Sequence, residues 1–219
     1  MSAMEKKKIN RFERVMYALF AAPIRFFMRI HCIGRENIPE EGGYVLVSNH
    51  ISFCDPVVIS AVFPSHRMPR YLAKAELFRI PVLSTLIRAL GAVPIDRSGK
   101  DMGAVRRAVS IAEGGDIISL FPQGTRRKGK NPADTPIKSG AGMIAAHAGV
   151  PILPVCIRLK KMRYAFLRRI DVVIGKPLSQ EELGLLTEKP DYKAATALAF
   201  SKVCELGGYR PTAITEPKV

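Results

Sequence analysis

Short hydrophobic runs alternate with longer helix-like segments along most of the chain. Runs rich in β-branched residues and bounded by turn residues predict strands, and these lie at residues 44–48, 70–73, 92–95, 117–121, 152–157 and 170–174. Segments with a helical pattern of apolar residues lie at 56–62, 81–90, 102–112, 140–148 and 192–206. Because strands and helices alternate, the sequence predicts an α/β fold with a mixed, mostly parallel sheet that helices cover.

The N-terminal segment, residues 1–35, has a different pattern and is predicted to anchor the protein to a membrane. Apolar residues recur there at steps of three and four, which places them on one face of a helix: Phe12, Val15, Met16, Leu19, Phe20, Pro23, Ile24 and Phe27. The first 29 residues carry seven basic and two acidic side chains, and a basic amphipathic helix of this kind lies among the lipid headgroups.

This helix is predicted to lie on the membrane and not to cross it. Its longest uncharged run, residues 15–24, is about half of the ~20 apolar residues that a crossing requires. Two alternatives are a signal peptide and a helix that docks on the protein core. The remaining residues, 36–219, contain no linker rich in serine, glycine or proline and are predicted to form one domain.

The charge of the chain favours an anionic partner. The 219 residues include 34 basic and 19 acidic side chains, a net charge of +15. Such an excess favours an acidic membrane surface, a phosphate-bearing substrate or nucleic acid. The amphipathic N-terminal segment favours the membrane, and the chain lacks the aromatic platforms of single-strand binders, so no nucleic-acid partner is predicted. We therefore expect a monotopic or peripheral protein at the cytoplasmic face of the cell membrane.

A histidine and a carboxylate lie five residues apart just after the first strand-like run. Asp55 is followed by Pro56 and an apolar segment, so it is predicted to be the N-cap of a helix with proline at the first helical position. The connection from His50 is short enough for the Asp55 carboxylate to fold back onto the imidazole. A histidine held in one tautomer by a carboxylate can take a proton from a hydroxyl group, as general-base catalysis requires. The alternative is a plain helix cap beside a loop histidine.

Three further segments follow in order. Residues 91–97 and 121–126 each combine an apolar run with a final arginine, and residues 150–154 are Val-Pro-Ile-Leu-Pro. With the His50-x4-Asp55 pair, these segments resemble the four motifs of the glycerophospholipid acyltransferase superfamily. The resemblance spans about residues 30 to 180, and the ordered set is far more specific than any one segment. One position differs: the third motif usually has glutamate after Phe-Pro, and this chain has Gln123.

The resemblance implies direct transfer of a fatty acyl group from acyl-CoA or acyl carrier protein to the free sn-2 hydroxyl of 1-acylglycerol 3-phosphate (lysophosphatidate), which gives phosphatidate. His50 would be the general base, oriented by Asp55, and no metal or bound cofactor is implied. Because Gln123 replaces the usual glutamate, glycerol 3-phosphate or another lysophospholipid is the alternative acceptor. A non-catalytic basic protein that binds membrane or nucleic acid is a remote alternative, since it would not need His50 and Asp55 at a fixed spacing.

Other residues are predicted to bind the substrate. Arg97 and Arg126 suit the acceptor phosphate, because a guanidinium forms two parallel hydrogen bonds with it; the alternative for each is a solvated surface arginine. Gly124 and Thr125 are predicted to form a turn whose backbone N–H groups face the substrate, with Gln123 beside them.

Lys74 is a further predicted substrate-binding residue. With Glu76 it is similar to a lysine–glutamate pair that members of the superfamily often carry between the first two motifs; an exposed salt bridge is the alternative. The tetrahedral oxyanion of an acyl transfer needs a hydrogen-bond donor. The candidates are Lys74 and a backbone N–H near residues 50–55, which we call the catalytic loop.

Overall fold

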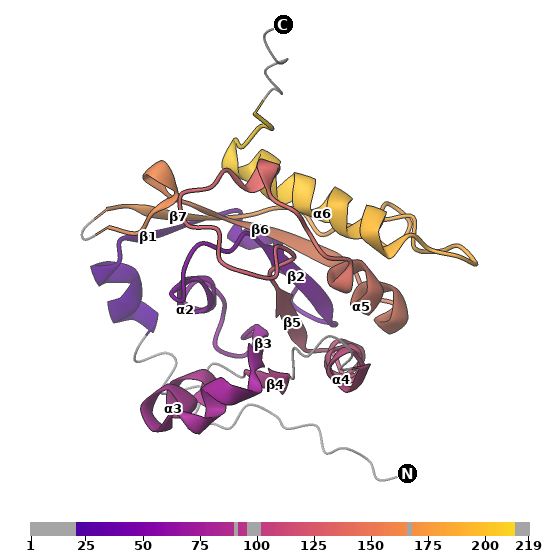
Figure 1. The fold of residues 1–219 in the computed structure, drawn as a ribbon, viewed down its shortest axis with the longest axis horizontal. Helices are drawn as coiled ribbons and strands as arrows, with labels where there is room; N and C mark the ends of the chain where they lie inside the picture. Colours follow the sequence, from indigo (N-terminus) through magenta and orange to yellow (C-terminus); the bar gives the residue numbers. More distant parts are fainter. Residues whose placement is uncertain (1–20, 90–91, 96–101, 166–167, 213–219) are drawn as a thin grey trace, which may run out of the picture.

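The computed structural model describes residues 21–89, 92–95, 102–165 and 168–212 and contains a seven-stranded sheet (Figure 1). Its strands in chain order are β1 (Ile30–Ile33), β2 (Tyr44–Ser48), β3 (Arg70–Lys74), β4 (Val93–Ile95), β5 (Ile117–Leu120), β6 (Ile152–Arg158) and β7 (Ile170–Ile174). They are arranged in the order β1-β7-β6-β2-β5-β3-β4, and every neighbouring pair is parallel except β6 and β7. The predicted mixed, mostly parallel sheet is confirmed.

Helices occupy the segments for which they were predicted. They are α2 (Asp55–Ser60), α3 (Pro81–Ala89), α4 (Met102–Glu113), α5 (Gly140–Ala148) and α6 (Tyr192–Gly207). The described part of the chain also forms four short 3-10 helices that the apolar pattern did not predict: η1 (Arg35–Asn37), η2 (Ala75–Arg79), η3 (Pro132–Asp134) and η4 (Lys160–Met162).

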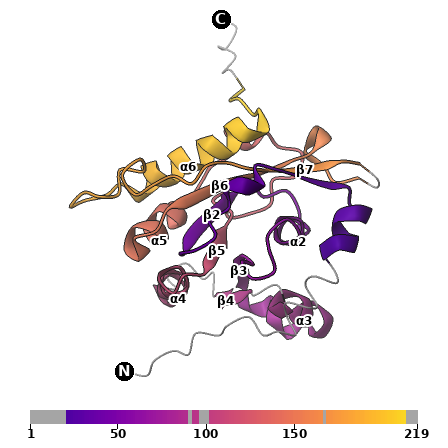
Figure 2. The same ribbon diagram turned by 180° about the vertical axis from the view of Figure 1, so that it is seen from behind.

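Strand β2 lies at the centre of two hydrophobic layers. Val45 and Val47 point into a cluster with α4, α5 and α6, whereas Tyr44 and Leu46 point into a second cluster with α2. Figures 1 and 2 show α4, α5 and α6 on one side of the sheet and α2 on the other. Both faces of β2 are buried, which is why its sequence is a continuous hydrophobic run and not an alternation with polar residues.

The close approach of α5 to α6 depends on a glycine. A Cβ atom at Gly142 would lie 2.3 Å from the backbone oxygen of Tyr192, so only a residue without a side chain fits. The backbone N–H of Gly142 also donates a hydrogen bond of 2.8 Å to Oγ1 of Thr196. This contact fixes α5, whose first residues lie next to the candidate site.

Strand β1 was not predicted from the sequence. Its four residues form too short a pattern to be identified as a strand without knowledge of the neighbouring strand. Ile30 pairs with Ile170, and β1 thereby extends the sheet beyond β7. Residues 21–27 are helical and lead into β1; Phe26 and Phe27 on this helix are 78% and 71% exposed. Residues 1–20, which carry most of the predicted amphipathic pattern, lie outside the described residues. None of the described helices has the length and apolar character needed to cross a membrane.

The carboxyl ends of β2, β3, β5 and β6 lie at one edge of the sheet, because these strands are mutually parallel. The segments that follow them in the chain therefore meet there, as in other open α/β sheets. This edge collects the residues of the first and third sequence motifs.

Candidate active site

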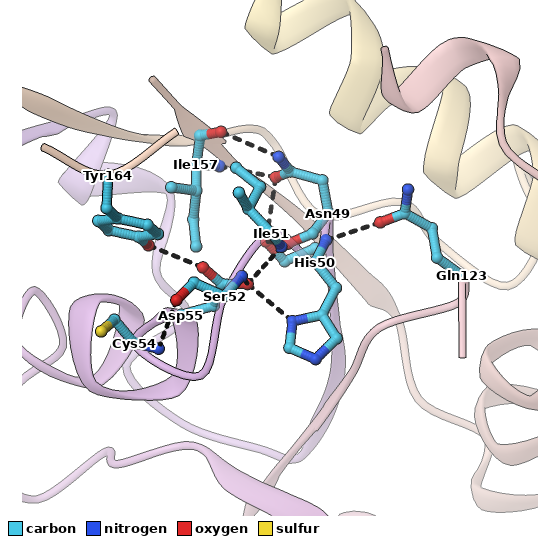
Figure 3. Close-up of polar contacts among 10 residues, drawn as sticks. Asn49, His50, Ile51, Ser52, Cys54, Asp55, Gln123, Ile157 and Tyr164 are labelled. Carbon is cyan, nitrogen blue, oxygen red and sulfur yellow. Dashed lines mark hydrogen bonds and ion pairs between the residues drawn. The ribbon is translucent and has the colours of Figure 1, made fainter. Parts of the chain in front are cut away.

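His50 and Asp55 are in direct contact at this edge. The imidazole Nδ1 of His50 lies 2.7 Å from Oδ2 of Asp55 (Figure 3). An ionised carboxylate only accepts hydrogen bonds, so Nδ1 is the donor and Nε2 of the neutral ring carries the free lone pair. The His50 side chain is 18% exposed and that of Asp55 is fully buried. The predicted contact between the two motif residues is confirmed, and it leaves a basic nitrogen facing away from the carboxylate.

The Asp55 carboxylate is held by several donors. Its Oδ2 also accepts hydrogen bonds from the backbone N–H groups of Ile51, at 2.6 Å, and Ser52, at 2.8 Å. Its Oδ1 accepts a hydrogen bond of 2.7 Å from the hydroxyl group of Tyr164. A buried charge needs such compensation, because removing it from water is costly. The four hydrogen bonds to Asp55 supply this compensation and fix the orientation of the carboxylate.

The prediction that Asp55 caps α2 is wrong. Asp55 is the first residue of the helix, and Cys54 occupies the N-cap position without a side-chain hydrogen bond. The Asp55 carboxylate turns back to the two N–H groups that precede it in the chain and to the imidazole. Pro56 was predicted at the first helical position and is the second residue of α2; it still lies in the first turn, where its missing N–H costs nothing.

Asn49 attaches the start of the catalytic loop to β6. Its Nδ2 donates to the backbone oxygen of Ile157 at 2.9 Å, and its Oδ1 accepts from the backbone N–H of the same residue at 2.8 Å. The amide thus imitates a peptide group and extends the pairing of β2 with β6 by one residue. Sequence reasoning missed this role, although an asparagine directly before the motif histidine was visible.

The third motif and the residue that follows it hold the backbone N–H and oxygen of His50. Oε1 of Gln123 accepts from the N–H of His50 at 2.6 Å, and the N–H of Arg127 donates to the backbone oxygen of His50 at 2.7 Å. The other end of the Gln123 amide donates to Oγ1 of Thr135 at 2.7 Å, whose hydroxyl donates in turn to the oxygen of Pro132. Gln123 is buried, and both ends of its amide are bonded to protein. Its predicted contact with substrate stays a prediction.

A cavity of about 310 Å³ opens beside His50. Its lining comes from β3, β4, α4, β5 and α5 and is mostly apolar, with side chains that include Leu72, Ile95, Val105, Leu120 and Ile144. The ring of Phe121 also lines it and stacks on the His50 imidazole, with the ring centres 4.1 Å apart and the planes at 16°. The basic nitrogen therefore adjoins a hydrophobic compartment, which we call the active-site cavity.

Two polar side chains in the cavity wall were not predicted from the sequence. Lys138 is the cationic side chain among the described lining residues, and it lies against Gly124, where a Cβ atom would be 2.9 Å from Cε of the lysine. The hydroxyl of Ser119, on β5, is buried and has no hydrogen-bond partner in the described part of the chain. No sequence signal distinguished either residue. Ser119 reaches the cavity through the pairing of β5 in the sheet, and Lys138 reaches it because the chain turns back after the third motif.

The predicted substrate-binding residues occupy different places. Gly124 lies in the cavity wall with φ of 66°, the left-handed conformation expected of a glycine turn. Thr125 and Arg126 are exposed and are not among the described residues of that wall. The guanidinium carbon of Arg126 lies 3.5 Å from the ring centre of Phe53, a cation–π contact that holds the side chain beside the catalytic loop.

The remaining two predictions concern Lys74 and Arg97. Lys74 is exposed at the end of β3, and no ion pair joins it to Glu76 within the described residues. Arg97 lies outside the described residues, so its predicted place next to Arg126 stays a prediction. Among the described residues there is also no cluster of histidine, cysteine or acidic side chains that could hold a metal ion.

The chain matches a protein family and individual proteins of known sequence. The family model described as Acyltransferase matches residues 29–158, more than half of the chain. The 1-acyl-sn-glycerol-3-phosphate acyltransferase of Bacillus subtilis is 25% identical over 174 residues, which cover 78% of this chain and 85% of that protein. That of Borreliella burgdorferi is 31% identical over 133 residues, which cover 59% of this chain and about half, 51%, of that protein.

A solved structure has the same fold. The crystal structure of PlsC from Thermotoga maritima, described as a 1-acyl-sn-glycerophosphate (LPA) acyltransferase, matches with a TM-score of 0.63 and 25% sequence identity. The match covers 93% of this chain and 86% of that one. The resemblance that the four motifs predicted is therefore confirmed, and the chain belongs to the Acyltransferase family.

Proposed function

We propose that this protein is a 1-acylglycerol-3-phosphate O-acyltransferase. It would transfer a fatty acyl group from acyl-CoA or acyl carrier protein to the free sn-2 hydroxyl of lysophosphatidate. The observation that carries the proposal is the 2.7 Å contact between Asp55 and His50, which lines a mainly apolar cavity. The names of the relatives in Bacillus subtilis and Borreliella burgdorferi support the acceptor class.

The proposed chemistry is a direct transfer with His50 as general base. Nε2 of His50 takes the proton of the acceptor hydroxyl as its oxygen attacks the thioester carbonyl. The new C–O bond forms, the tetrahedral intermediate collapses, and the C–S bond breaks. The imidazolium then returns the proton to the leaving thiolate, while Asp55 stabilises the positive charge on the ring. No acyl-enzyme is needed, because hydroxyl and thioester are bound together.

The active-site cavity is the proposed compartment for an acyl chain. Its wall is mainly apolar, and burying hydrocarbon against such side chains is favourable by roughly 25 cal/mol per Å². Phe121 fixes the imidazole ring at the entrance by stacking on it. An acyl chain in this cavity would bring its polar end to Nε2 of His50, where the reaction takes place.

Cations around the catalytic loop are the proposed phosphate ligands. Arg126 is held over Phe53 next to that loop, and Lys138 lies in the cavity wall beside Gly124. Arg97 is proposed to join them from the second motif. The acceptor phosphate would thus be bound between the exposed Arg126 and Lys138 of the cavity wall, where it remains partly hydrated. Lys74 or a backbone N–H of the Gly124 turn is proposed as the donor to the oxyanion.

Membrane attachment through the N-terminal segment, residues 1–35, is part of the proposal. The exposed rings of Phe26 and Phe27 support it, because they contact each other, with ring centres 5.5 Å apart, and apolar side chains exposed together favour a membrane or a partner surface. Such attachment at the cytoplasmic face would concentrate the enzyme where both acylated substrates partition. An anionic lipid surface would also attract the net charge of +15.

The deciding experiment is an acceptor panel with the purified protein. Acyl-CoA would be incubated with lysophosphatidate, glycerol 3-phosphate or lysophosphatidylcholine, and the release of free thiol would be followed. We expect release that depends on lysophosphatidate and falls to background in His50→Ala. Faster turnover with glycerol 3-phosphate would assign the alternative acceptor. Thiol release that is independent of every acceptor, or absent with all of them and with acyl carrier protein as donor, would contradict the proposal.

A further inference from the structure

The hydroxyl group of Tyr164 reaches the far oxygen of the catalytic carboxylate. It donates a hydrogen bond of 2.7 Å to Oδ1 of Asp55 (Figure 3). His50 and the backbone N–H groups of Ile51 and Ser52 all bind Oδ2 instead. Within the described part of the chain, Tyr164 is therefore the donor to Oδ1. The contact joins the segment after β6 to the loop after β2, 109 positions apart.

The backbone just before Tyr164, in η4, has an energetically unfavourable conformation. Lys161 and Met162 in η4 have φ angles of 57° and 49°, the left-handed region that residues with a side chain rarely occupy. The backbone oxygen of Met162 accepts a hydrogen bond of 3.1 Å from the N–H of Gly129, so the segment is also bonded to the loop after β5. Strain of this kind persists where the surrounding contacts require it, often at functional sites.

Tyr164 is a fixed donor. Burial and the neighbouring charge of Asp55, which accepts its hydrogen bond, raise the pKa of Tyr164 well above its usual range. The phenol therefore keeps its proton at every pH at which the enzyme would work. Since Oδ1 of Asp55 can only accept, the direction of the hydrogen bond is also fixed.

We propose that Tyr164 is a positioning residue of the catalytic pair, which holds the Asp55 carboxylate in the orientation that binds Nδ1 of His50 and withdraws negative charge from it. This inference rests on the proposed general-base role of His50. Within the described residues, the titratable side chains bonded to Asp55 are His50 and Tyr164; Cys54 helps to raise the pKa of Tyr164, and Lys138 lies in the same cavity wall as His50. Among them, only Tyr164 donates to Asp55 without contacting the substrate.

The consequences of removing this donor follow from charge. Without the phenol hydrogen, more negative charge remains on the carboxylate, and the imidazolium beside it is bound more strongly. Protonation of His50 then begins at a higher pH, so the acidic limb of the pH–rate profile moves to higher pH. The carboxylate also loses one of its fixed contacts, and the free base is less well oriented. The first change lowers turnover on the acidic side of the profile, and the second lowers it at every pH; neither changes the cavity or the cations around it.

The test uses Tyr164→Phe, which keeps the ring and its packing against the apolar layer beside α2. We expect kcat to fall roughly tenfold, the value of one hydrogen bond to a charged group, with KM for both substrates nearly unchanged. Tyr192→Phe is the matched control: it removes the hydroxyl of another half-buried tyrosine, which lies at the start of α6, packs beside His147 of α5 and has no contact with the His50–Asp55 pair. Thermal unfolding of both variants would show whether folding is intact.

A double-mutant cycle separates positioning from a general structural role. If Tyr164 acts through the charge of Asp55, Tyr164→Phe should have little further effect in an Asp55→Asn background. Equal effects in both backgrounds, or a Tyr164→Phe enzyme that behaves like Tyr192→Phe, would overturn the inference.

An NMR titration of the His50 imidazole tests the inference independently of turnover. The His50 signal would be identified by its absence in His50→Gln, and its midpoint should move to higher pH in Tyr164→Phe but not in Tyr192→Phe. A midpoint that does not move would overturn the inference. If the wild-type protein transfers no acyl group, the proposed function fails, and this titration still decides whether Tyr164 controls the His50–Asp55 pair.

Discussion

The backbone N–H of His50 donates a hydrogen bond of 2.6 Å to the side-chain Oε1 of Gln123, 73 positions further along the chain. The residue in which this chain departs from its superfamily therefore supports the catalytic loop from inside the protein. An amide suits this position beside Thr135. The Thr135 hydroxyl already donates its hydrogen to the backbone oxygen of Pro132, so Oγ1 can accept a hydrogen bond from Nε2 of Gln123.

The first prediction tests this support. Gln123→Leu should lower the free energy of unfolding by about 1–3 kcal/mol, because the N–H of His50 is left buried without a partner. Gln123→Glu should cost less, since a carboxylate oxygen still accepts from His50, although Thr135 must then turn its hydroxyl away from Pro132. Urea denaturation of the two variants checks the ranking. Equal stability of Gln123→Leu and wild type would show that this hydrogen bond contributes nothing.

The second prediction concerns the proposed base. His50→Ala should lower kcat by roughly 10²–10⁴-fold, the usual contribution of a positioned general base. Asp55→Asn should also be severely impaired, because the imidazole loses its charged partner. Circular dichroism and vesicle binding should be unchanged in His50→Ala. Retention of more than about a tenth of wild-type turnover would remove His50 from the role of base.

The third prediction concerns the cations. Arg126→Ala and Lys138→Ala should each raise KM for lysophosphatidate, by roughly tenfold if each forms one charged hydrogen bond to the phosphate. Arg126→Lys should recover only part of the loss, because an ammonium cannot form the paired hydrogen bonds of a guanidinium. Arg97→Ala is expected to behave like Arg126→Ala. Initial rates over a range of acceptor concentrations measure the effect. Lys176→Ala is the control, because Lys176 lines a separate hollow beside α6. Unchanged saturation in the Arg126, Lys138 and Arg97 variants would place the phosphate elsewhere.

The fourth prediction concerns the active-site cavity. Val105 on α4 is half-buried in its wall, and Val105→Phe would fill part of the space. If an acyl chain lies there, kcat/KM should fall for long-chain acyl substrates and change little for short ones. A panel of acyl-CoA and lysophosphatidate chain lengths, varied one substrate at a time, also shows which chain occupies the cavity. The same proportional loss at every length would argue against an acyl compartment.

The fifth prediction concerns membrane attachment. Leu19→Asp and Phe20→Asp should release the protein from vesicles of anionic lipid at any salt concentration, because the apolar face is lost. Reversing the charge of Lys6, Lys7 and Lys8 should instead release it chiefly at moderate salt, since each cation adds roughly 1 kcal/mol that salt screens. Flotation measures both. Activity on a short-chain, water-soluble acceptor should survive; its loss in a folded variant would place this segment in the catalytic core.

The amino-acid sequence by itself determined the α/β class, the main strands and helices, and the pairing of His50 with Asp55. These features depend on short-range information. A strand buried on both faces has a continuous apolar run, and two side chains five positions apart on a tight loop are close enough to meet whatever the rest of the chain does. The N-cap assignment of Asp55 failed within the same short range. The carboxylate found stronger partners in the two preceding N–H groups and the imidazole than in the helix that follows it.

Only the tertiary structure decided which distant residues support this pair. Tyr164 reaches Asp55 because β6 lies beside β2, and Gln123 reaches His50 because β5 lies on the other side of β2. Strand β1 likewise exists only as a partner of β7. Hydrophobic periodicity shows that a strand is buried but not which strand is its neighbour, because every apolar strand gains similar free energy from burial. The order of the strands, which is set by the packing of the whole chain, brings the loops together and so completes the site.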